Sequence, residues 1–380
     1  MDSLMKRHNL LKTILFSLIL MFSNSCYRLY TGSYSQPNFS PNEQPNNLGE
    51  KVEIWEDAQR TSGKSGEFEW WYFDAKLEDG SLFVCYFWKV HHLVDQYFIG
   101  MNYNAKNGDE IFLLKYFSES QVSFSTESCN VIMGDNYFRG DLNDYEIFLS
   151  PDDFDGFSIR LNLSSRLKPY RPQDGIIKAG DDYFAWLAAV PDGEVSGNIK
   201  INESVTSIKG DGYHDHNWGN TPLQKLFDGW VWFRGKAGPY TIIASELFTS
   251  DKRGGFDIPI LYVANKEGVI INQFGNDGAF TKYSNRINNL YNIKNEPFFS
   301  NFDLMTESGE KVSISGQNVI DNTNLFSRMK LLKPLAWVLK QSAKQILIDP
   351  HYTRFDSELE IQLDSLTKKG YGVLEIMDLK

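Results

Sequence analysis

A short string in the middle of the chain carries most of its candidate chemistry. Residues 213–218 read Tyr-His-Asp-His-Asn-Trp, and glycines on both sides permit sharp bends or close backbone approach. A carboxylic acid beside imidazoles in an aromatic cavity can have its proton affinity tuned by desolvation and by neighbouring charge. The alternative is a buried hydrogen-bonded network with a structural role. We predict acid–base catalysis by Asp215, with His214 and His216 setting its charge state and with Tyr213, Asn217 and Trp218 contacting the substrate.

The same string does not predict a metal site. In an extended strand, His214 and His216 lie on one face and Asp215 lies on the other. A His-x-His pair on one strand face can bind a metal ion, but a catalytic zinc needs three protein ligands. No third ligand is apparent nearby on the histidine face, so we expect no metal and no other cofactor.

A second polar and aromatic string lies nearer the N-terminus. Residues 67–74 read Glu-Phe-Glu-Trp-Trp-Tyr-Phe-Asp, which places three carboxylates among five rings. Tryptophan and tyrosine faces can hold a cation or a conjugated ligand, and a girdle of packed aromatic side chains is the structural alternative. His91 and His92 end the neighbouring apolar run and are candidates for the same space. In this string Glu69 is a candidate catalytic residue, and the candidate substrate-binding residues are Trp70, Trp71, Tyr72 and Asp74.

Composition and motifs argue against several functional classes. The 380 residues carry a net charge of −11, which repels phosphate backbones and argues against a nucleic-acid partner. The sequence contains no Gly-x-Ser-x-Gly string, no phosphate-cradling glycine loop and no dinucleotide fingerprint. Cofactor-driven redox chemistry and phosphoryl transfer therefore have no support in the sequence.

The N-terminus has the order of a bacterial secretory signal. A basic start is followed by the apolar run Leu10–Phe22 and by small residues directly before Cys26. This order resembles a lipobox, although a lipobox usually carries Leu where Ser23 stands. It predicts a signal peptide at 1–25, a lipidated Cys26 and a membrane-anchored lipoprotein in the bacterial cell envelope. Ordinary signal-peptidase cleavage and an uncleaved anchor are the alternatives. Residues 26–50 are rich in Ser, Pro, Asn and Gln, and we predict that they form a flexible tether.

Two further cysteines, Cys85 and Cys129, follow the tether. In an oxidising envelope they could form a disulfide. Because Cys85 lies inside an apolar run, a buried free thiol is the other interpretation.

Past residue 51 the pattern is that of β-structure. Short runs rich in Val, Ile, Phe, Tyr and Trp are separated by turn residues, and Asp79-Gly80 and Asn107-Gly108 suit tight hairpins. Strands in this number usually form a sandwich or a closed barrel. The string Gly-Trp-Val-Trp-Phe at 229–233 echoes the string at 69–73 about 160 residues earlier, which either two related β-domains or chance would explain. We place the boundary between the two domains at 207/208.

One segment departs from the β pattern. Residues 324–348 mix apolar side chains with five lysines and arginines and contain no acidic residue. They predict a basic, amphipathic, helical insert that Pro334 breaks or kinks. The insert either packs on the second domain with a solvated lysine face or meets anionic lipid headgroups.

Three strings together resemble the motifs of a known family. Glu69–Asp74, Tyr213–Gly219 and Gly370–Glu375 are similar to those of the carotenoid 1,2-hydratase (hydroxyneurosporene synthase)/AttH family, and the resemblance spans about residues 55–380. It implies an all-β fold of two tandem lipocalin-like antiparallel β-barrels, residues 51–207 and 208–380, with the short helical insert in the second. It also implies a hydrophobic small-molecule ligand: a polyene, an isoprenoid or a lipid.

The resemblance implies a chemistry that the residues can support. Members of the family include hydro-lyases that add water to a terminal carotenoid double bond, and related fungal proteins that guide polyene cyclisation. By analogy, Asp215 would protonate an alkene, the faces of Trp71, Tyr72 and Trp218 would stabilise the carbocation, and water would capture it. A non-catalytic lipocalin-like carrier of a hydrophobic envelope molecule is the main alternative, and a structural envelope protein is a third class.

Lipidation of Cys26 is directly testable. In a bacterium fed a fatty-acid analogue, the chain should become labelled and the Cys26→Ala variant should not, because the lipid is attached through the cysteine sulfur. Gel fluorescence of the membrane fraction measures the label. Equal labelling of the two proteins would rule out Cys26 as the lipidated residue.

Overall fold

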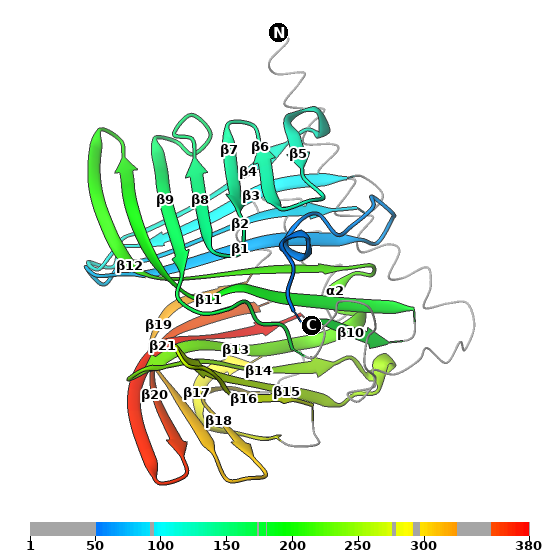
Figure 1. Ribbon diagram of the computed structural model, residues 1–380, viewed down its shortest axis with the longest axis vertical. Helices are drawn as coiled ribbons and strands as arrows, with labels where there is room; N and C mark the ends of the chain where they lie inside the picture. Colours follow the sequence, from blue (N-terminus) through cyan, green and yellow to red (C-terminus); the bar gives the residue numbers. More distant parts are fainter. Residues whose placement is uncertain are drawn as a thin grey trace.

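The structure is a computed structural model that describes residues 51–91, 95–172, 175–179, 181–275, 279–291, 297–324 and 351–379. These residues form two antiparallel sheets of 12 and 9 strands, each curled into a nearly closed barrel (Figure 1). Helix in the described residues is limited to α2 (Leu223–Leu226) and the 3-10 segments η1 (Ile54–Asp57), η2 (Glu119–Gln121) and η3 (Asp251–Arg253). The expected all-β class with two antiparallel barrels is confirmed.

Several sequence predictions fall outside the described residues. These are the signal segment, Cys26 and its tether, His92, and all of the basic insert except Asn324. In the described part of the chain, no helix has the length and apolarity that a membrane span requires.

The first barrel is built from the larger sheet. Its strands are β1 (Phe68–Leu77), β2 (Leu82–Val90), β3 (Gln96–Asn104), β4 (Glu110–Phe117), β5 (Val122–Phe124), β6 (Cys129–Met133), β7 (Asn136–Gly140), β8 (Asp144–Leu149), β9 (Phe157–Ser165), β10 (Ile176–Ala179), β11 (Asp182–Ile201) and β12 (Ser204–Gly219). Their order is β4-β3-β2-β1-β12-β11-β9-β8-β7-β6-β5, with β10 beside β11. Both predicted hairpins form, and Gly80 (φ 93°) and Gly108 (φ 90°) supply the left-handed backbone that these turns require.

The motif strand β12 belongs to the first barrel. It pairs with β1 on one side, with Asp215 opposite Tyr72, and with β11 on the other. The chain changes sheets only after Gly219, so the division expected at 207/208 would cut through β12. The physical reason is that the β11–β12 hairpin supplies the hydrogen bonds that satisfy the edge of β1.

The second barrel is built from the smaller sheet. Its strands are β13 (Phe227–Ala237), β14 (Tyr240–Thr249), β15 (Asp257–Asn265), β16 (Gly268–Phe274), β17 (Ala279–Tyr291), β18 (Pro297–Thr306), β19 (Lys311–Asn324), β20 (His351–Leu363) and β21 (Leu366–Asp378). Their order is β16-β15-β14-β13-β21-β20-β19-β18-β17.

The two barrels hold their aromatic strings at equivalent positions. In the first sheet β1 lies between β2 and β12, and in the second sheet β13 lies between β14 and β21. Tyr72 lies opposite Asp215, and Trp232 lies opposite Glu375. Trp232 lies 160 residues after Tyr72, and Glu375 lies 160 residues after Asp215. The same interval separates Asp74 from Arg234. The echo in the sequence therefore corresponds to a repeated strand arrangement.

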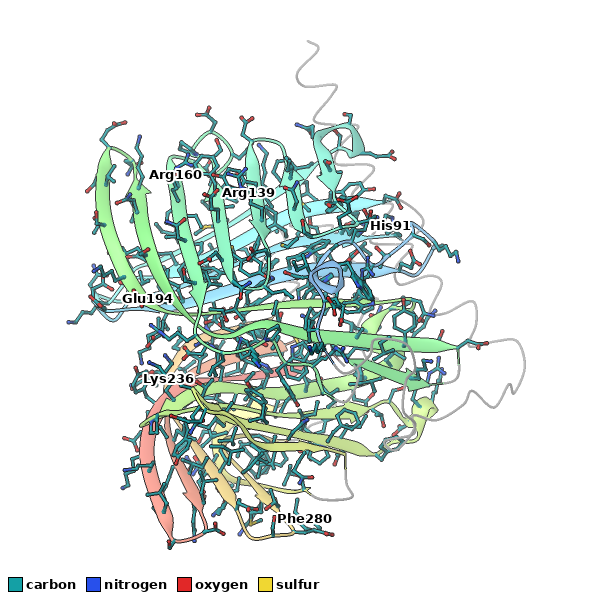
Figure 2. The ribbon with its side chains drawn as sticks, viewed as in Figure 1. His91, Arg139, Arg160, Glu194, Lys236 and Phe280 are labelled. Carbon is teal, nitrogen blue, oxygen red and sulfur yellow. The ribbon has the colours of Figure 1, made fainter. Side chains whose placement is uncertain are left out.

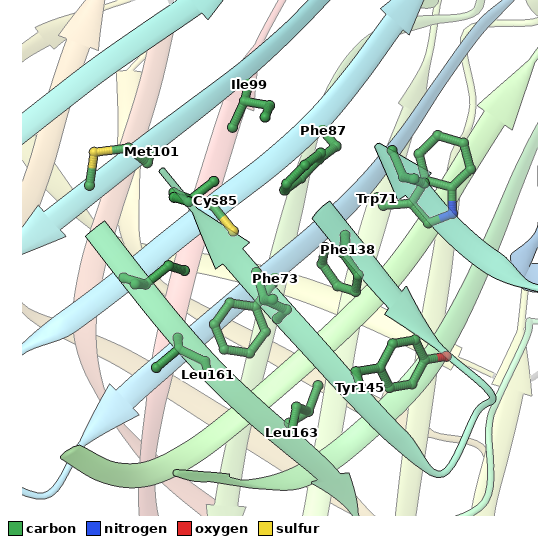
Figure 3. Close-up of a cluster of buried hydrophobic side chains, with 14 of the residues drawn as sticks. Trp71, Phe73, Cys85, Phe87, Ile99, Met101, Phe138, Tyr145, Leu161 and Leu163 are labelled. Carbon is green, nitrogen blue, oxygen red and sulfur yellow. The ribbon is translucent and has the colours of Figure 1, made fainter. Parts of the chain in front are cut away.

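Each barrel has its own apolar core, and a third core joins them. Figure 3 shows the first core, where Phe73, Phe87 and Phe138 point inward. The third core consists of outward-facing side chains of β1, β11 and β12 packed on those of β13, β14 and β15, including Trp186 and Trp232. Because the two barrels are stacked along the long axis (Figure 1), the segment Gly212–Gly219 of β12 is buried on both faces, and the side chains of β1 beside it are buried or half-buried.

Ion pairs also connect the barrels. Asp74 on β1 pairs with Arg234 on β13, and the two side chains are 9% and 7% exposed. Lys76 pairs with Asp356 at 3.1 Å where both side chains are more exposed. Lys236, labelled in Figure 2 at the edge where the barrels meet, reaches both Asp192 and Asp211 on the first barrel.

The Arg234→Met variant tests how much the buried pair stabilises the junction. Removing the guanidinium leaves Asp74 buried without its cation, so the free energy of unfolding should fall by about 3–5 kcal/mol. The Lys76→Met variant removes the more exposed pair and should cost at most about 1 kcal/mol. Urea denaturation at neutral pH measures both variants. Equal, small losses would contradict a buried Asp74–Arg234 pair that holds the barrels together.

Candidate functional site

Strand β12 divides the predicted site between two buried faces. His214, His216 and Trp218 contact rings inside the first barrel, whereas Tyr213, Asp215 and Asn217 point into the junction between the barrels. None of these six side chains is more than 7% exposed. The structure therefore does not bring Asp215 and the two histidines into one catalytic unit. We call the histidine side the interior cluster and the Asp215 side the junction cluster.

In the interior cluster, Glu69 is surrounded by donors. Its carboxylate is 2.9 Å from His216 Nε2 and 2.8 Å from Lys89 Nζ, and it accepts hydrogen bonds from Thr61 Oγ1 and the Arg60 backbone N–H. Burial opposes ionisation, but the hydrogen bond from His216 and the charge of Lys89 outweigh it and lower the pKa of Glu69 to about 2. Glu69 is therefore an ionised acceptor, which does not suit it to donate a proton.

His214 bridges β1 and the N-terminal segment that enters the barrel. Its Nδ1 is 2.8 Å from the Tyr72 carbonyl oxygen, and its Nε2 is 3.1 Å from Asp57 Oδ2. Asp57 ends η1 and also accepts a hydrogen bond from the Tyr145 hydroxyl at 2.5 Å. The interior cluster thus ties η1 to β12 and to the far side of the barrel.

Of the polar groups in the interior cluster, the sequence patterns singled out Glu69 but not Asp57, Lys89 or Tyr145. Asp57, Lys89 and Tyr145 lie far from the motif in sequence and meet it only when the barrel closes. One signal was present: Lys89 is the single charge in the apolar run 82–90. A lone inward-facing lysine requires a buried anion, which Glu69 supplies.

In the junction cluster, Asp215 has only neutral hydrogen-bond donors. Oδ2 accepts from the Tyr213 hydroxyl at 2.9 Å and from Trp186 Nε1 at 3.1 Å, and Oδ1 accepts from Asn217 Nδ2 at 2.7 Å. Burial raises the pKa of Asp215 to about 7. The three hydrogen-bond donors, and the charge of His214 on the opposite face of the sheet, act in the other direction but do not cancel the effect of burial. Near neutral pH a large fraction of Asp215 is therefore protonated and able to act as a general acid.

Aromatic rings line the junction next to Asp215. The ring centroids of Tyr72 and Trp232 both lie close to that of Tyr213, at 6.3 Å and 5.2 Å, and Tyr72 and Trp232 are 6.4 Å apart. Trp71 and Trp218, also predicted to line the site, instead flank His216 on the interior face. Trp70 stacks on Trp88 at 4.3 Å, away from these three rings.

Glu375 is a second acid of the junction, equivalent to Asp215 in the repeat. It accepts a hydrogen bond from the Tyr72 hydroxyl at 3.4 Å. Burial raises its pKa to about 7, although the charge of Arg354 and a hydrogen bond from Tyr352 oppose the shift. The spacing of about 160 residues between the two aromatic strings could have identified Glu375 from the sequence, because Glu375 follows Asp215 by the same interval.

The remaining candidates have other surroundings. Asp74 is paired with Arg234, and His91 contacts Asp95 at 3.0 Å rather than either cluster. Cys85 and Cys129 are both buried and free, so they form no disulfide with each other.

Asp215 does not line either of two cavities at the surface of the described residues. The larger, of about 710 Å³, is a depression over β6–β9 that reaches Cys129 and Tyr145. The smaller, of about 20 Å³, lies between the barrels at Lys76, Arg234 and Tyr371.

The Glu69→Gln variant tests the interior cluster. Folding favours the carboxylate of Glu69, so its contribution to stability is complete above pH of about 4.5 and is lost as the pH falls to about 2. At neutral pH the variant should lose about 3–5 kcal/mol, because Lys89 is left buried without its anion. Urea denaturation should show that the difference in the free energy of unfolding between wild type and variant becomes smaller as the pH falls from about 4.5 to about 2.

The exposed pair of Arg139 and Glu146 provides the control. Glu146→Gln should cost at most about 1 kcal/mol at any pH in this range. A constant difference between wild type and Glu69→Gln down to the lowest pH would contradict an ionised, stabilising Glu69.

Comparisons with known proteins agree with this architecture. The sequence profile of the Diels-Alderase-like family matches residues 64–273, which include both motif strings. A hydroxyneurosporene dehydrogenase of Chlorobaculum tepidum is 26% identical over 204 residues, 44% of this chain and 53% of that protein. The quinolone epoxide rearrangement protein asqO of Emericella nidulans is 29% identical over 97 residues, 24% of this chain and 27% of that protein. The chain thus spans about half or less of the length of these curated relatives.

Solved structures show the same fold. A putative AttH from Nitrosomonas europaea aligns with a TM-score of 0.61 at 12% identity, over 88% of this chain and 98% of that one. Kievitone hydratase from Nectria haematococca aligns with a TM-score of 0.57 at 11% identity, over 90% and 97%. At such identities the likeness concerns the fold alone. Together with the sequence matches, it confirms the expected relationship to the carotenoid 1,2-hydratase/AttH family.

Proposed function

Because the chain belongs to the Diels-Alderase-like family, we propose that it is an enzyme that acts on an apolar substrate by acid-initiated chemistry at the junction of its barrels. One observation carries the proposal: Asp215 is buried, has no cation among its hydrogen-bond partners and adjoins aromatic rings. The proposal retains the catalytic role predicted for Asp215. It assigns structural roles to His214 and His216, because they lie on the opposite face of β12.

The proposed substrate is an acyclic polyene or isoprenoid. Protonated Asp215 transfers its proton to one carbon of a trisubstituted alkene, and the alkene π electrons form the new C–H bond. The tertiary carbocation that results is stabilised by the π-faces of Tyr72, Tyr213 and Trp232. Water adds to the cation and gives up a proton, so the product is an alcohol. Asp215 is left ionised and must regain a proton, from Glu375 or from solvent, before the next turnover.

Glu375 is the proposed acceptor of the proton that the water loses. Its hydrogen bond from Tyr72 places it beside one of the rings that would surround the cation. Two acids with pKa values near 7 allow one to be protonated while the other is ionised at neutral pH. If another part of the substrate captures the cation instead of water, the same groups support cyclisation or rearrangement, the latter in keeping with the name of the asqO relative.

A non-catalytic carrier is the second candidate function, favoured by a ladder of rings outside the first barrel. Trp70 stacks on Trp88, Trp88 lies 5.9 Å from Phe98, and Phe98 lies 5.4 Å from Tyr116. These rings cross β1–β4 and offer flat faces to a conjugated ligand.

The proposed setting is the bacterial envelope. The N-terminal signal pattern with Cys26 supports this proposal. We further propose that the basic segment 324–348 makes a second contact, with anionic lipid. A lipid anchor would hold the junction near a membrane that dissolves apolar substrates.

The Asp215→Asn variant tests the acid. It keeps the shape of the side chain and removes the proton donor, so turnover should fall by roughly 10²–10⁴-fold. Apolar molecules that copurify with the protein, identified by mass spectrometry, supply the substrate. Incorporation of oxygen from oxygen-18 water into that substrate measures hydration. The wild-type rate should fall as the pH rises above about 7, because Asp215 loses its proton.

Exposed Glu194, labelled in Figure 2, is the control position. Glu194→Gln should leave the rate unchanged. Full turnover in a folded Asp215→Asn protein would rule out the mechanism. Ligand binding by both proteins, without turnover by either, would favour the carrier, and loss of the fold in Asp215→Asn would indicate a structural role.

A further inference from the structure

We propose that the first barrel binds one divalent transition-metal ion of the zinc class through Asp57, Cys129 and His214. The site lies on the interior face of β12, on the side of the strand opposite Asp215. Its role is to fix η1 inside the barrel.

The three side chains meet at one point from distant parts of the chain. Asp57 comes from η1, Cys129 from the start of β6 and His214 from β12. One potential ligand atom of each lies within 4.8 Å of the others. In a tetrahedral zinc site with bonds of roughly 2.0–2.3 Å the ligand atoms are roughly 3.5 Å apart, so small side-chain rotations bring the three ligands to bonding distance, and a water molecule would take the fourth position. Oxygen, sulfur and nitrogen are the three ligand types that zinc takes from proteins.

Neighbouring groups already hold two of these ligands in the orientation that a metal needs. His214 Nδ1 faces the Tyr72 carbonyl at 2.8 Å, which fixes the proton on Nδ1 and leaves Nε2 directed towards Asp57 and Cys129. A metal-bound histidine usually makes this contact to a carbonyl or carboxylate. Tyr145 orients the Asp57 carboxylate through Oδ2. The other oxygen, Oδ1, is buried, and it forms an ion pair with His216 Nδ1 at 3.6 Å, a distance longer than a hydrogen bond.

An ion would relieve two unfavourable features of the cluster. Without one, the lone pair of His214 Nε2 faces the Asp57 carboxylate unless the ring takes a second proton. Asp57 Oδ1, which lies 3.6 Å from His216 Nδ1, also gains a direct bond when a cation binds. A divalent ion, the carboxylate and a thiolate sum to zero charge, which suits the aromatic walls of Phe138 and Tyr145.

Binding requires that Cys129 lose its proton. Burial raises the pKa of Cys129, with a further contribution from Asp57, so the free thiol is neutral and its Sγ lies 3.7 Å from the Phe138 carbonyl oxygen. The ion displaces this proton: the S–H bond breaks, a metal–sulfur bond forms and the proton passes to solvent. The depression over β6–β9, whose lining includes Cys129 and Tyr145, provides the route for ion and proton.

Cobalt(II) is the probe for this site. The full chain, purified without a polyhistidine tag, should bind one equivalent of cobalt and show a thiolate-to-cobalt charge-transfer absorption. The Cys129→Ser variant should lose the absorption. Cys85→Ser is the matched control, because Cys85 is also a buried thiol of the first barrel but does not belong to the cluster.

The Tyr145→Phe variant separates ligation from folding. It keeps the ring and all three ligands but removes the hydroxyl that orients Asp57, so it should weaken metal affinity by about 10–100-fold. In wild type, zinc should raise the melting temperature and a chelator should reverse the rise. Absence of bound cobalt in folded wild type, or the same charge-transfer band in Cys129→Ser, would overturn the proposal. If Cys129→Ser does not fold, the wild-type stoichiometry and the Tyr145→Phe affinity decide it.

Discussion

The segment Gly212–Gly219 of strand β12 is buried on both faces, and this constraint governs how the polar groups of the motif are used. A strand at a barrel surface normally exposes alternate side chains to water, but the second barrel covers the outer face of β12. Each polar side chain must therefore find a protein partner. On the interior face His216 contacts Glu69 of β1, which Lys89 also contacts and which is held as an anion. On the junction face Asp215 finds only neutral donors, and holds a proton near neutral pH.

The repeat shows which of these features the two barrels share. Asp215 and Glu375 occupy equivalent positions, and burial raises the pKa of both. The interior positions differ: Leu374 and Ile376 of the second barrel stand where the first has His214 and His216. The junction acids thus belong to the common plan of the barrels, whereas the polar interior cluster is particular to the first. This difference agrees with separate roles, chemistry at the junction and attachment of η1 inside the first barrel.

Much of the fold could be predicted because its signals are local. Alternating apolar residues and turn dipeptides such as Asp79-Gly80 specify strands and hairpins through backbone preferences that need no distant partner. The position of the domain boundary could not be predicted in this way. Whether β12 joins the first or the second sheet depends on its pairing with β1, which lies more than a hundred residues earlier in the sequence.

The sequence by itself determined the β class, the repeated aromatic strings, the family and the alternation that sets Asp215 apart from its neighbouring histidines. These follow from residue order along one strand or from matching strings. Only the tertiary structure decided what each side chain faces. Barrel closure brings Asp57 to His214 across more than a hundred residues, and barrel stacking brings Trp232 and Glu375 beside Tyr72. Proton affinity depends on burial and on such distant partners, so the same carboxyl group is a fixed anion at Glu69 and an acid at Asp215.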